Sequence, residues 1–408
     1  MITVIGFDGS PLTGRAAEAL AAASLVVGGA RHLAAVPVPQ QARTVVLGSL
    51  ERGMAELARD STGRAVVVAS GDPGFFGIVR ALRAAGHRPA VLPAVSSVAQ
   101  AFARVGVPWD DALVVSTHGR DAGRDVSRAA NVCRSHSKVA VLTGPGAGPA
   151  ELGAMLTGTY RTLHVLTNLG TDAEEWLDCS PEEAALRDWD EPNVVISLAP
   201  GEPGGPARWH AGADPAPSQW GLPEHEFLHR DSMVTKAEVR ALVLARLGPG
   251  LGRCIWDVGA GSGSVAVECA RLGAYAIAVE RDPEACARVE ANAGTHGVEV
   301  AVVAGEAPAV LEGLPDPDAV FVGGGGLPAL VAAAARRPAR LVASFAAMDH
   351  ALAARAELRR GGYTVDGVQL AANRFAELPD DSVRLAATNP VFVIWGVRAL
   401  PEPQEASS

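Results

Sequence analysis

We predict an α/β protein with two to three domains, and three features of the 408-residue chain support this prediction. Short β-branched and apolar runs alternate with alanine-rich helical stretches up to about residue 200, a pattern typical of sheets covered by helices. A glycine-rich turn between an apolar run and a helical stretch begins at Gly259. The stretch Pro200 to Pro223 is dense in proline and glycine and cannot hold a helix or a central strand, so we expect a linker there.

The first part of the chain contains eight candidate strands, separated by helical stretches such as Gly14–Ala23, Leu50–Arg59 and Ser97–Arg104. This alternation favours a largely parallel sheet with helices on its faces. The segment Val107 to Asp110 can divide this part into two lobes. The candidate strands are Ile2–Ile5, Leu25–Val27, Thr44–Leu47, Ala65–Ala69, Ala112–Ser116, Lys138–Leu142, Leu163–Thr167 and Asn193–Leu198.

Loops containing glycine, proline and polar residues follow several of these strands. Taken alone, the stretch Ser70 to Gly77 is better explained as a simple strand–helix connection. Together they predict a ligand site, because open α/β sheets bind ligands beyond the carboxyl ends of parallel strands. The loops are Ile5 to Gly9, Ser70 to Gly77, Pro93 to Ser97, His118 to Arg120 and Leu142 to Pro145.

The second part of the chain is organised around a strand, a glycine-rich turn and a helix. Ile255 to Val258 is an apolar run, and Val265 to Leu272 has a helical pattern. Between them, Gly259, Gly261 and Gly263 allow positive φ angles and let a ligand approach the backbone closely. The helix start presents unpaired N–H groups and the positive end of the helix dipole. This arrangement suits a nucleotide-like ligand.

A carboxylate after the next strand supports the same interpretation. The strand Ala276–Val279 ends at Glu280, which lies 23 residues after Asp257, near the spacing of about 20 at which dinucleotide-binding folds place a ribose-binding acid. No Gly-Lys-Ser/Thr sequence follows the turn, so it is not a phosphate loop. With Asp257 beside it, the turn resembles the S-adenosylmethionine turn of class I methyltransferases, and an NAD site is the alternative.

The remaining elements of the second part complete an α/β domain. A helix from Lys236 to Leu247, with Thr235 as its N-terminal cap, leads into the glycine turn. The later strands are expected at Glu299–Val303, Ala319–Val322, Arg340–Ser344, Tyr363–Ala371 and Val391–Gly396.

Bulk properties exclude several functional classes. The net charge of −10 and the pI of about 5.5 argue against nonspecific nucleic-acid binding, which needs clustered Lys and Arg. No apolar run reaches the roughly 18 to 20 residues of a membrane span, and the first residues form a strand pattern rather than a signal sequence. We therefore expect a cytoplasmic protein. The five cysteines show no CxxC pairing, so we expect small buried hydrophobic residues rather than disulfides.

One competing motif is His225-Glu226-Phe227-Leu228-His229, which matches the HExxH pattern of zinc hydrolases. That chemistry needs both histidines on one face of a helix and a third ligand. Here the motif follows Pro223 at the end of the expected linker, and nothing amphipathic surrounds it. We therefore expect no metal site.

The loops of the first part together resemble the tetrapyrrole methylase family, whose class III fold binds S-adenosylmethionine between two α/β lobes. The resemblance covers roughly Ile2 to Leu198, and Gly71-Asp72-Pro73 with Gly77 is its most specific element. It implies that Gly71, Asp72, Ser96 and Ser97 line the cofactor pocket and that His118 and Arg120 face substrate carboxylates. For His118, a satisfied loop histidine is an equally good interpretation.

The motifs of the second part resemble the decarboxylating precorrin methyltransferase domain, a Rossmann-like class I fold, over about Asp231 to Gly396. They are Met233 to Arg240, the glycine turn, Gly305 to Pro308, Ala319 to Gly325 and Asn389 to Val393. The resemblance implies that Met233, Thr235, Asp257, Gly259, Gly261 and Gly263 contact the methionine and ribose parts of the cofactor. It also implies that Glu280 binds the ribose, that Glu306 and Ala307 border the adenine, and that Gly323 borders the reacting centre.

Two departures from this family pattern are visible. The family usually has Asp at the position of Glu306, so the adenine contact could move outward. Ser344 to Asp349 differs from the usual Asn-Ala-x-Thr-Leu-Glu, which removes the basis for a polar substrate role there.

Tetrapyrrole precursors carry many carboxylate arms, so Arg and Lys side chains are expected at the rim of a substrate pocket. The candidates are Lys236, Arg240 and Arg374 in the second part and Arg120 in the first. For Lys236 and Arg240, which lie one helical turn apart, a solvated face is the alternative. No residue can be named as a catalytic acid, base or proton donor from the sequence.

The two resemblances together imply two S-adenosylmethionine-dependent methylations of a tetrapyrrole in cobalamin biosynthesis, one cofactor per domain, with loss of carbon dioxide. We expect a tetrapyrrole methylase domain at 1–200 that methylates C5, a linker at 201–223, and a class I domain at 224–400 that methylates C15 and decarboxylates. We also expect a homo-oligomer that binds neither nucleic acid nor membrane. The alternatives are a nucleic-acid or protein methyltransferase with a noncatalytic front domain, and a cofactor-binding sensor without turnover.

Overall fold

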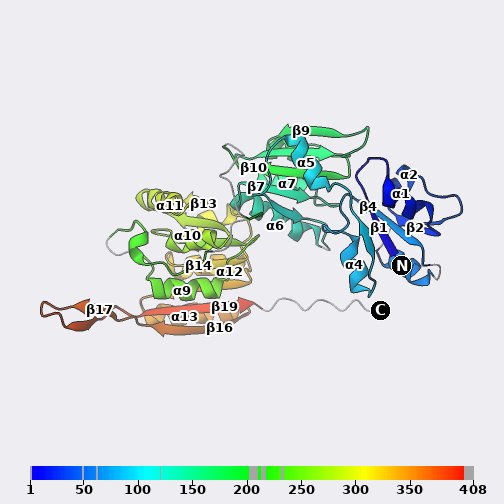
Figure 1. Cartoon of the computed structure of the whole chain (residues 1–408). Helices are drawn as coiled ribbons and strands as arrows, with labels where there is room; N and C mark the ends of the chain where they lie inside the picture. The colour runs from blue at the N-terminus through cyan, green and yellow to red at the C-terminus, as the bar shows by residue number, and fades with distance from the viewer. Residues whose placement is uncertain are drawn as a thin grey trace. The chain divides into compact units, whose positions relative to one another are not determined.

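The computed structural model describes residues 2–47, 50–60, 63–119, 121–201, 210–212, 217–230 and 234–398. The chain forms two compact units, which are coloured blue to green and green to red in Figure 1. The first unit comprises Met1–Ala129 and His136–Ala213, and the second comprises Ala130–Ser135 and Asp214–Ser408. Among the described residues, no helix is both long enough and apolar enough to cross a bilayer.

The first lobe of the first unit is a five-stranded sheet in the order β3-β2-β4-β1-β5, and all of its ladders are parallel. Buried aliphatic side chains alternate between its two faces, as Val4 and Ile5 of β1 do, and helices cover both faces. The strands are β1 (Ile2–Phe7), β2 (Leu25–Gly28), β3 (Arg43–Val46), β4 (Ala65–Ser70) and β5 (Ala90–Leu92), and the helices are α1 (Gly14–Ala21), α2 (Ala30–Ala35), α3 (Leu50–Arg59) and α4 (Ile78–Ala84).

The second lobe of this unit is a mixed sheet in the order β6-β7-β10-β8-β9. Only β6 and β7 pair in parallel, so the prediction of a largely parallel sheet is wrong for this lobe. Strand β10 inserts between β7 and β8 and runs antiparallel to both, a direction that hydrophobic patterning does not encode. The strands are β6 (Leu113–Ser116), β7 (Lys138–Leu142), β8 (Thr162–Thr167), β9 (Glu175–Cys179) and β10 (Asn193–Leu198), and the helices are α5 (Ser97–Val105), α6 (Ala122–Ser135), α7 (Pro149–Leu156) and α8 (Pro181–Ala185).

The second unit contains a seven-stranded sheet in the order β13-β12-β11-β14-β15-β19-β16, with β19 antiparallel to both of its neighbours. Helices α9, α10 and α11 pack on one face, and α12 and α13 pack on the other, in agreement with the Rossmann-like class I fold that the resemblance implies. The strands are β11 (Cys254–Val258), β12 (Tyr275–Glu280), β13 (Val300–Ala304), β14 (Ala319–Val322), β15 (Arg340–Phe345), β16 (Tyr363–Leu370) and β19 (Val391–Arg398). The helices are α9 (Ala237–Leu247), α10 (Ser264–Arg271), α11 (Pro283–Thr295), α12 (Gly326–Ala335) and α13 (Met348–Arg360), with 3-10 turns η1 (Glu224–Glu226) and η2 (Ala309–Gly313).

A two-stranded hairpin, β17 (Arg374–Glu377) with β18 (Val383–Ala386), was not predicted. It lies between β16 and β19 in the chain and projects from the edge of the second unit, at the left of Figure 1. Phe375 and Leu385 form a cross-strand pair, and 84% and 59% of their surfaces are exposed. Because the hairpin contributes so little to the core, its strands carry no strong hydrophobic pattern in the sequence.

Two local predictions can be compared with the structure. The N-cap residue of α9 is Lys236, whose own side chain makes no capping hydrogen bond, so the prediction of Thr235 as the cap is wrong. The Ala237 N–H in the first turn donates to the side chain of Glu224, which is distant in sequence, at 3.2 Å to Oε1. All five cysteines are buried free thiols, in agreement with their interpretation as small buried side chains.

Candidate cofactor and substrate sites

The glycine turn of the second unit lies between β11 and α10 and has the left-handed backbone that only glycine adopts easily. The φ angles of Gly259, Gly261 and Gly263 are +73°, +58° and +72°. A Cβ on Gly259 would lie 2.4 Å from Cα of Gly324, because the loop after β14 passes directly beside the turn. A Cβ on Gly261 would meet no atom within 4 Å. The turn is therefore packed against the Gly324 backbone at Gly259, and it has free space beside Gly261.

Glu280, at the end of β12, is held against this turn. Its Oε2 accepts the Gly261 N–H at 2.8 Å, and its Oε1 accepts the N–H groups of Arg281 and Asp282 at 2.8 and 3.1 Å. Because β11 and β12 are parallel neighbours, both strands end at the same edge of the sheet. The structure thus brings the carboxylate and the open part of the turn together, at the position where doubly wound folds bind a ribose.

Asp257 lies inside strand β11 and is 2% exposed. Its Oδ2 accepts the Ala266 N–H at 3.0 Å. This N–H lies in the first turn of α10, where the helix itself supplies no acceptor. Burial raises the pKa of Asp257 to about 7, with a smaller contribution from the charge of Glu280 and an opposing one from the Ala266 N–H. In this structure Asp257 fastens the helix to the strand beneath the turn.

Two other predicted contacts lie around the same edge of the sheet. The N–H groups of Gly323 and Gly324 donate to the Val258 carbonyl at 3.0 and 3.1 Å, so Gly323 borders the glycine turn. Glu306 is exposed and pairs with Arg281 at 3.0 Å, and Ala307 follows it in the loop after β13. Met233 lies outside the described residues.

The segment that precedes α9 is tied to the domain by a fully buried ion pair. Nε of Arg240 donates to Glu268 at 2.5 Å, and the two side chains are 0% and 1% exposed. Glu268 also accepts the N–H groups of Gly221 and Leu222 at 2.7 and 3.0 Å. The guanidinium of Arg240 donates in addition to the carbonyls of Leu222 and Thr235. The prediction that Arg240 lies at a pocket rim and the alternative that it lies on a solvated face are both wrong. The Arg240 side chain is fully buried, and its charge is paired with Glu268.

Asn292 on α11 forms a second tie between this segment and the glycine turn. It is 1% exposed, and its Nδ2 donates to the carbonyls of Leu228 and Ser262 at 3.0 and 2.8 Å. Its Oδ1 accepts the Leu228 N–H at 2.7 Å. Sequence reasoning missed Asn292 and Glu268, because a buried polar residue on a helix gives no local signal.

Arg374 and Lys236 line a small cavity of about 80 Å³, together with Glu238, Thr388 and Asn389. Arg374 donates to both Glu224 and Glu238, with shortest distances of 2.8 Å. The Arg374 hydrogen bonds lower the pKa of Glu224 to about 2. Two carboxylates therefore already neutralise Arg374, which leaves it poorly suited to bind a substrate carboxylate.

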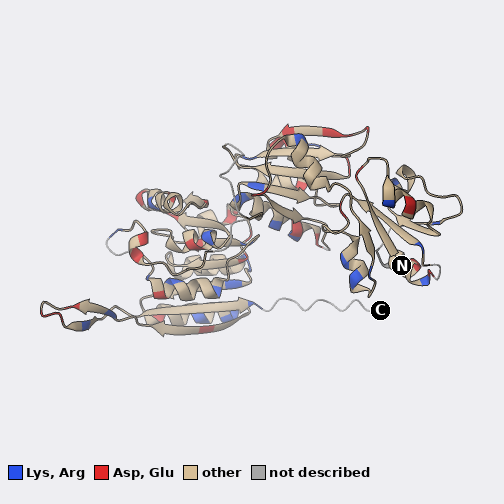
Figure 2. Ribbon diagram, in the orientation of Figure 1, with Lys and Arg blue, Asp and Glu red and all other residues tan. Residues whose placement is uncertain are grey.

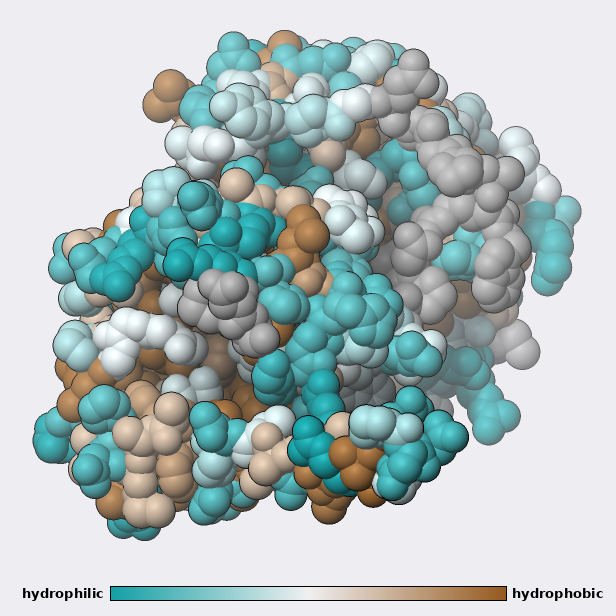
Figure 3. Space-filling view, turned by 90° about the vertical axis from the view of Figure 1, so that its left-hand side faces the viewer, coloured by the Kyte–Doolittle hydropathy of each residue, from teal (hydrophilic) through white to brown (hydrophobic). Residues whose placement is uncertain are grey.

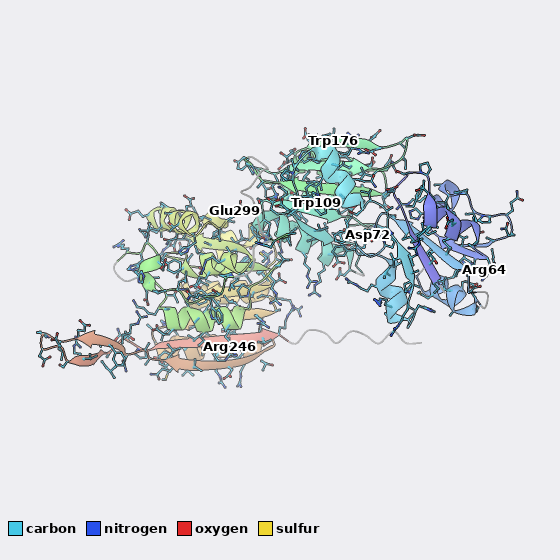
Figure 4. The ribbon with its side chains drawn as sticks, in the orientation of Figure 1. Arg64, Asp72, Trp109, Trp176, Arg246 and Glu299 are labelled. Atoms are coloured by element: carbon cyan, nitrogen blue, oxygen red, sulfur yellow. The ribbon has the colours of Figure 1, made fainter. Side chains whose placement is uncertain are left out.

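In the first unit, the loops after β1, β4 and β5 meet at one edge of the parallel sheet, because these strands are neighbours. The Gly71 N–H donates to the Phe7 carbonyl at 2.8 Å, and a Cβ on Gly71 would lie 3.0 Å from Cα of Ser96 and 3.1 Å from N of Ser97. Oδ1 of Asp72 accepts the Gly74 N–H at 2.8 Å (Figure 4 labels Asp72). The structure thus brings Gly71 and the Ser96-Ser97 turn together, as the resemblance implies.

Ser96 itself has a structural use. It is the N-cap of α5, and its Oγ accepts the Ala99 N–H at 3.1 Å. The neighbouring loop is held by Asp8, whose Oδ2 accepts the Val95 N–H at 3.2 Å. Backbone groups and small residues therefore form most of this edge.

A larger cavity of about 350 Å³ lies in the first unit and includes His118. Burial lowers the pKa of His118, so the ring is neutral at neutral pH. Thr143 and Asn193 form one wall, because the antiparallel pairing of β10 with β7 places the start of one strand beside the end of the other. The other lining residues are Arg31, Gly144, Pro145, Glu191 and Pro192. Arg120 lies outside the described residues.

Arg31 was not predicted as a site residue, although a signal for it exists. It follows Gly28-Gly29-Ala30 after β2, and the same rule that selected the other loops beyond parallel strands applies to this one.

The HExxH residues do not form a helix with two histidines on one face. Glu224–Glu226 is a short 3-10 turn, and the side chain of His225 is 80% exposed. Across the described residues, no group of three or more His, Cys, Asp or Glu side chains could hold a metal ion.

The residues at the second unit's sheet edge fit an adenosyl cofactor. The turn is open above Gly261 and leads into the N-terminus of α10, and a carboxylate is fixed beside it. In the first unit, several loops meet at the edge of the parallel sheet. Gly71 lies where a Cβ would crowd the backbone of Ser96.

Comparisons with known proteins match both parts of the chain. The family model described as tetrapyrrole (corrin/porphyrin) methylases matches residues 6–185, and the model described as a precorrin methyltransferase domain matches residues 226–378. A probable cobalt-precorrin-6B C(15)-methyltransferase (decarboxylating) from Pyrobaculum calidifontis is 37% identical over 43% of this chain and 94% of its own length. A cobalt-precorrin-7 C(5)-methyltransferase from Salmonella typhimurium is 30% identical over 48% of this chain and 98% of its own length.

One relative combines both activities in its name. The precorrin-6Y C(5,15)-methyltransferase [decarboxylating] of a Sinorhizobium species is 38% identical over 343 residues, which is 80% of this chain and 78% of that protein. The chain therefore pairs a tetrapyrrole methylase fold with a class I methyltransferase-like fold, and it belongs to the family of decarboxylating precorrin-6Y C5,15-methyltransferases.

Proposed function

We propose that this chain methylates precorrin-6Y at C5 and C15 with S-adenosylmethionine as the donor and removes carbon dioxide from the ring C acetate. The observation that carries the proposal is the presence of two separate sheet-edge sites in two units, each matched by a different methyltransferase family model. We assign C5 methylation to a domain at 1–200, and C15 methylation and decarboxylation to a domain at 224–400, joined by a linker at 201–223.

The residues of the second unit act mainly by binding and positioning. S-adenosylmethionine supplies an activated methyl group with its own leaving group, so no strong protein nucleophile is needed. Glu280 would accept the ribose hydroxyls while the Gly261 N–H keeps its carboxylate in place. Asp257 holds the start of α10, Arg240 binds the Thr235 carbonyl, and Asn292 joins Leu228 to Ser262 in the glycine turn. This rigidity is what a transfer reaction between two bound partners requires.

We also propose one cofactor molecule in each unit. In the first unit it would lie beside Gly71, Asp72, Ser96 and Ser97, and in the second beside Thr235, Asp257, Gly259, Gly261, Gly263, Glu280, Glu306, Ala307 and Gly323. Met233 remains part of this proposal as a residue outside the described ranges. Close backbone packing around Gly71 and around Gly259 supports both positions.

Equilibrium dialysis with labelled S-adenosylmethionine tests the stoichiometry. We expect two molecules bound per wild-type chain, and one in each of the variants Asp72→Ala and Glu280→Ala. Product mass and carbon dioxide release from precorrin-6Y test the assignment, and we expect carbon dioxide release to be lost only in Glu280→Ala. A single bound cofactor in the wild type, or carbon dioxide release unaffected by Glu280→Ala, would contradict the proposal.

A nucleic-acid substrate is disfavoured by the distribution of charge. Acidic and basic residues are interspersed along the ribbons of both units in Figure 2, whereas nucleic-acid binding faces are predominantly basic. Transfer of label to RNA, with none to the tetrapyrrole, would favour that alternative. Cofactor binding without transfer to any substrate would favour a sensor.

We further propose that the protein acts in the cytoplasm as a homo-oligomer. Five buried free thiols suit a reducing compartment. The exposed apolar pair Phe375 and Leu385 on the isolated hairpin would gain stability from contact with a second copy. Light scattering of the wild type and of Phe375→Ser tests the assembly, and a monomeric wild type would contradict it.

A further inference from the structure

The cavity of the first unit contains Arg31, a cation for which the described residues supply no ion-pair partner. Nη2 of Arg31 donates to Oγ of Ser70 at 2.7 Å, and no ion pair of Arg31 occurs among the described residues. A guanidinium has five N–H donors, so most of its donors remain available on the cavity side. Burial lowers the pKa of Arg31, but an arginine remains protonated at any physiological pH.

The guanidinium is held in position by its neighbours. Ser70 Oγ also contacts Nε2 of His32 at 3.0 Å. Burial, with help from the adjacent charge of Arg31, lowers the pKa of His32 to about 4, so the ring is neutral at neutral pH. In the tautomer that leaves Nε2 unprotonated, the neutral ring accepts the Ser70 hydroxyl hydrogen, and Oγ keeps its lone pairs for Arg31. The arrangement His32–Ser70–Arg31 therefore orients a charged group toward the cavity before any ligand arrives.

Two other polar residues of the cavity, Thr143 and Asn193, already form hydrogen bonds with protein groups. The Thr143 hydroxyl donates to Asn193, and Nδ2 of Asn193 donates to the Asp190 carbonyl at 2.9 Å. Glu191 acts electrostatically on His118, whose pKa it raises slightly against the larger effect of burial. No comparable effect of Glu191 on Arg31 is present. Among the described lining residues, Arg31 is thus the cation that can receive an anion.

We propose that Arg31, oriented by Ser70 and His32, binds one carboxylate arm of the tetrapyrrole substrate during the methylation carried out by the first unit. A planar guanidinium matches a carboxylate in a two-bond geometry. The cavity of about 350 Å³ admits such an arm beside the neutral His118. This inference deepens the proposed function and depends on it.

The test uses the full chain and its second reaction as an internal control. Arg31→Gln should raise the KM of precorrin-6Y for C5 methylation by about 10- to 100-fold, which corresponds to one charge-assisted hydrogen-bonded pair. The KM for C15 methylation, resolved by mass spectrometry of the same reactions, should not change. Arg83→Gln on the exposed surface of α4 is the matched control and should change neither value.

Two further variants separate binding from general damage to the fold. Arg31→Lys keeps the charge but loses the planar fork, so its KM should lie between those of the wild type and Arg31→Gln. Ser70→Ala keeps the charge and removes only its orientation, so we expect a KM increase of about threefold to tenfold. A substrate esterified on its carboxylates should show the same KM with wild type and Arg31→Gln.

The outcomes distinguish the two levels of the proposal. If the wild type forms neither methylated product, the proposed function fails. If the wild type forms both products and Arg31→Gln leaves the KM of C5 methylation unchanged, the function stands and the role of Arg31 is wrong. An equal rise of both KM values, or a lower kcat at unchanged KM, would also contradict a substrate-binding role for Arg31.

Discussion

The cavities of the two units differ in what their arginines contact. In the first unit, Arg31 lines a cavity of about 350 Å³ and donates to a neutral hydroxyl. In the second unit, Arg374 lines a cavity of about 80 Å³ and is bound by two carboxylates. An arginine near a pocket is therefore a substrate-binding candidate only when the protein has left its charge unpaired.

Three further arginines of the second unit also contact protein groups. Arg240 is buried with Glu268, and Arg336 pairs with Asp316 at 2.6 Å while lying over the Trp256 ring. Arg246 stacks on Trp395 at 4.1 Å, beside β19 in Figure 4. On the face of the molecule shown in Figure 3, hydrophilic and hydrophobic side chains are interspersed. These three arginines thus support the fold of the second unit.

The largest expected effect tests the buried anchor. Arg240→Met should destabilise the second unit by about 3–5 kcal/mol, because it leaves the Glu268 carboxylate buried without its charge partner. Calorimetry of the full chain measures this loss. The double variant Arg240→Met/Glu268→Leu should be destabilised less than the single variant, although the N–H groups of Gly221 and Leu222 then lose their acceptor. A single variant as stable as the wild type would show that Arg240 is not an anchor.

The next prediction separates structural from ligand-facing positions within the glycine turn. Gly259→Ala should destabilise the fold by about 2–4 kcal/mol, because its Cβ would overlap Gly324 and its φ is positive. Gly261→Ala should cost only about 1–2 kcal/mol, since its Cβ meets open space. The second variant should nevertheless lose cofactor binding, measured by dialysis. Equal stability of the two variants would contradict this distinction.

A pH-dependence is expected from Asp257. Its pKa in the folded chain is about 7, above the usual value of 3.8, so the folded state holds more protons than the unfolded state between these values. Stability should therefore fall as the pH rises from about 4 to 7, by at most about 1.4 kcal/mol per pH unit. Denaturant unfolding at several pH values measures the slope, and Asp257→Asn should remove this contribution. A slope that is the same in the variant would assign it to another group.

The smallest effect belongs to the exposed arginine of the second unit. Arg374→Gln should change stability by about 0–1 kcal/mol, because Arg374 is 43% exposed and solvent screens its pairs. It should also leave the KM of C15 methylation nearly unchanged, in contrast to the effect of Arg31→Gln on C5 methylation. A rise of tenfold or more in the KM of C15 methylation would show that Arg374 also binds substrate, and would contradict the distinction drawn between Arg374 and Arg31.

The regular elements were predictable wherever hydrophobic patterning is strong. The strand Ala319–Val322 and the helix Leu50–Arg59 have the bounds that were predicted, because the strand is a continuous buried apolar run and the helix is amphipathic. The small strand β5 and the exposed hairpin β17–β18 were missed, because few of their side chains are buried. The glycine turn and Glu280 were predictable because positive φ angles and a strand end are local properties of the chain.

The sequence by itself determined the α/β class, the position of the glycine turn and the acid that follows the next strand, since these depend on local patterns and short spacings. Only the tertiary structure decided that β10 runs antiparallel beside β7, that Arg240 is buried, and that no carboxylate in the described part of the chain pairs with Arg31. The reason is physical: the state of a charge depends on the groups that packing brings next to it, and those partners lie 28 residues away for Arg240 and 39 residues away for Arg31.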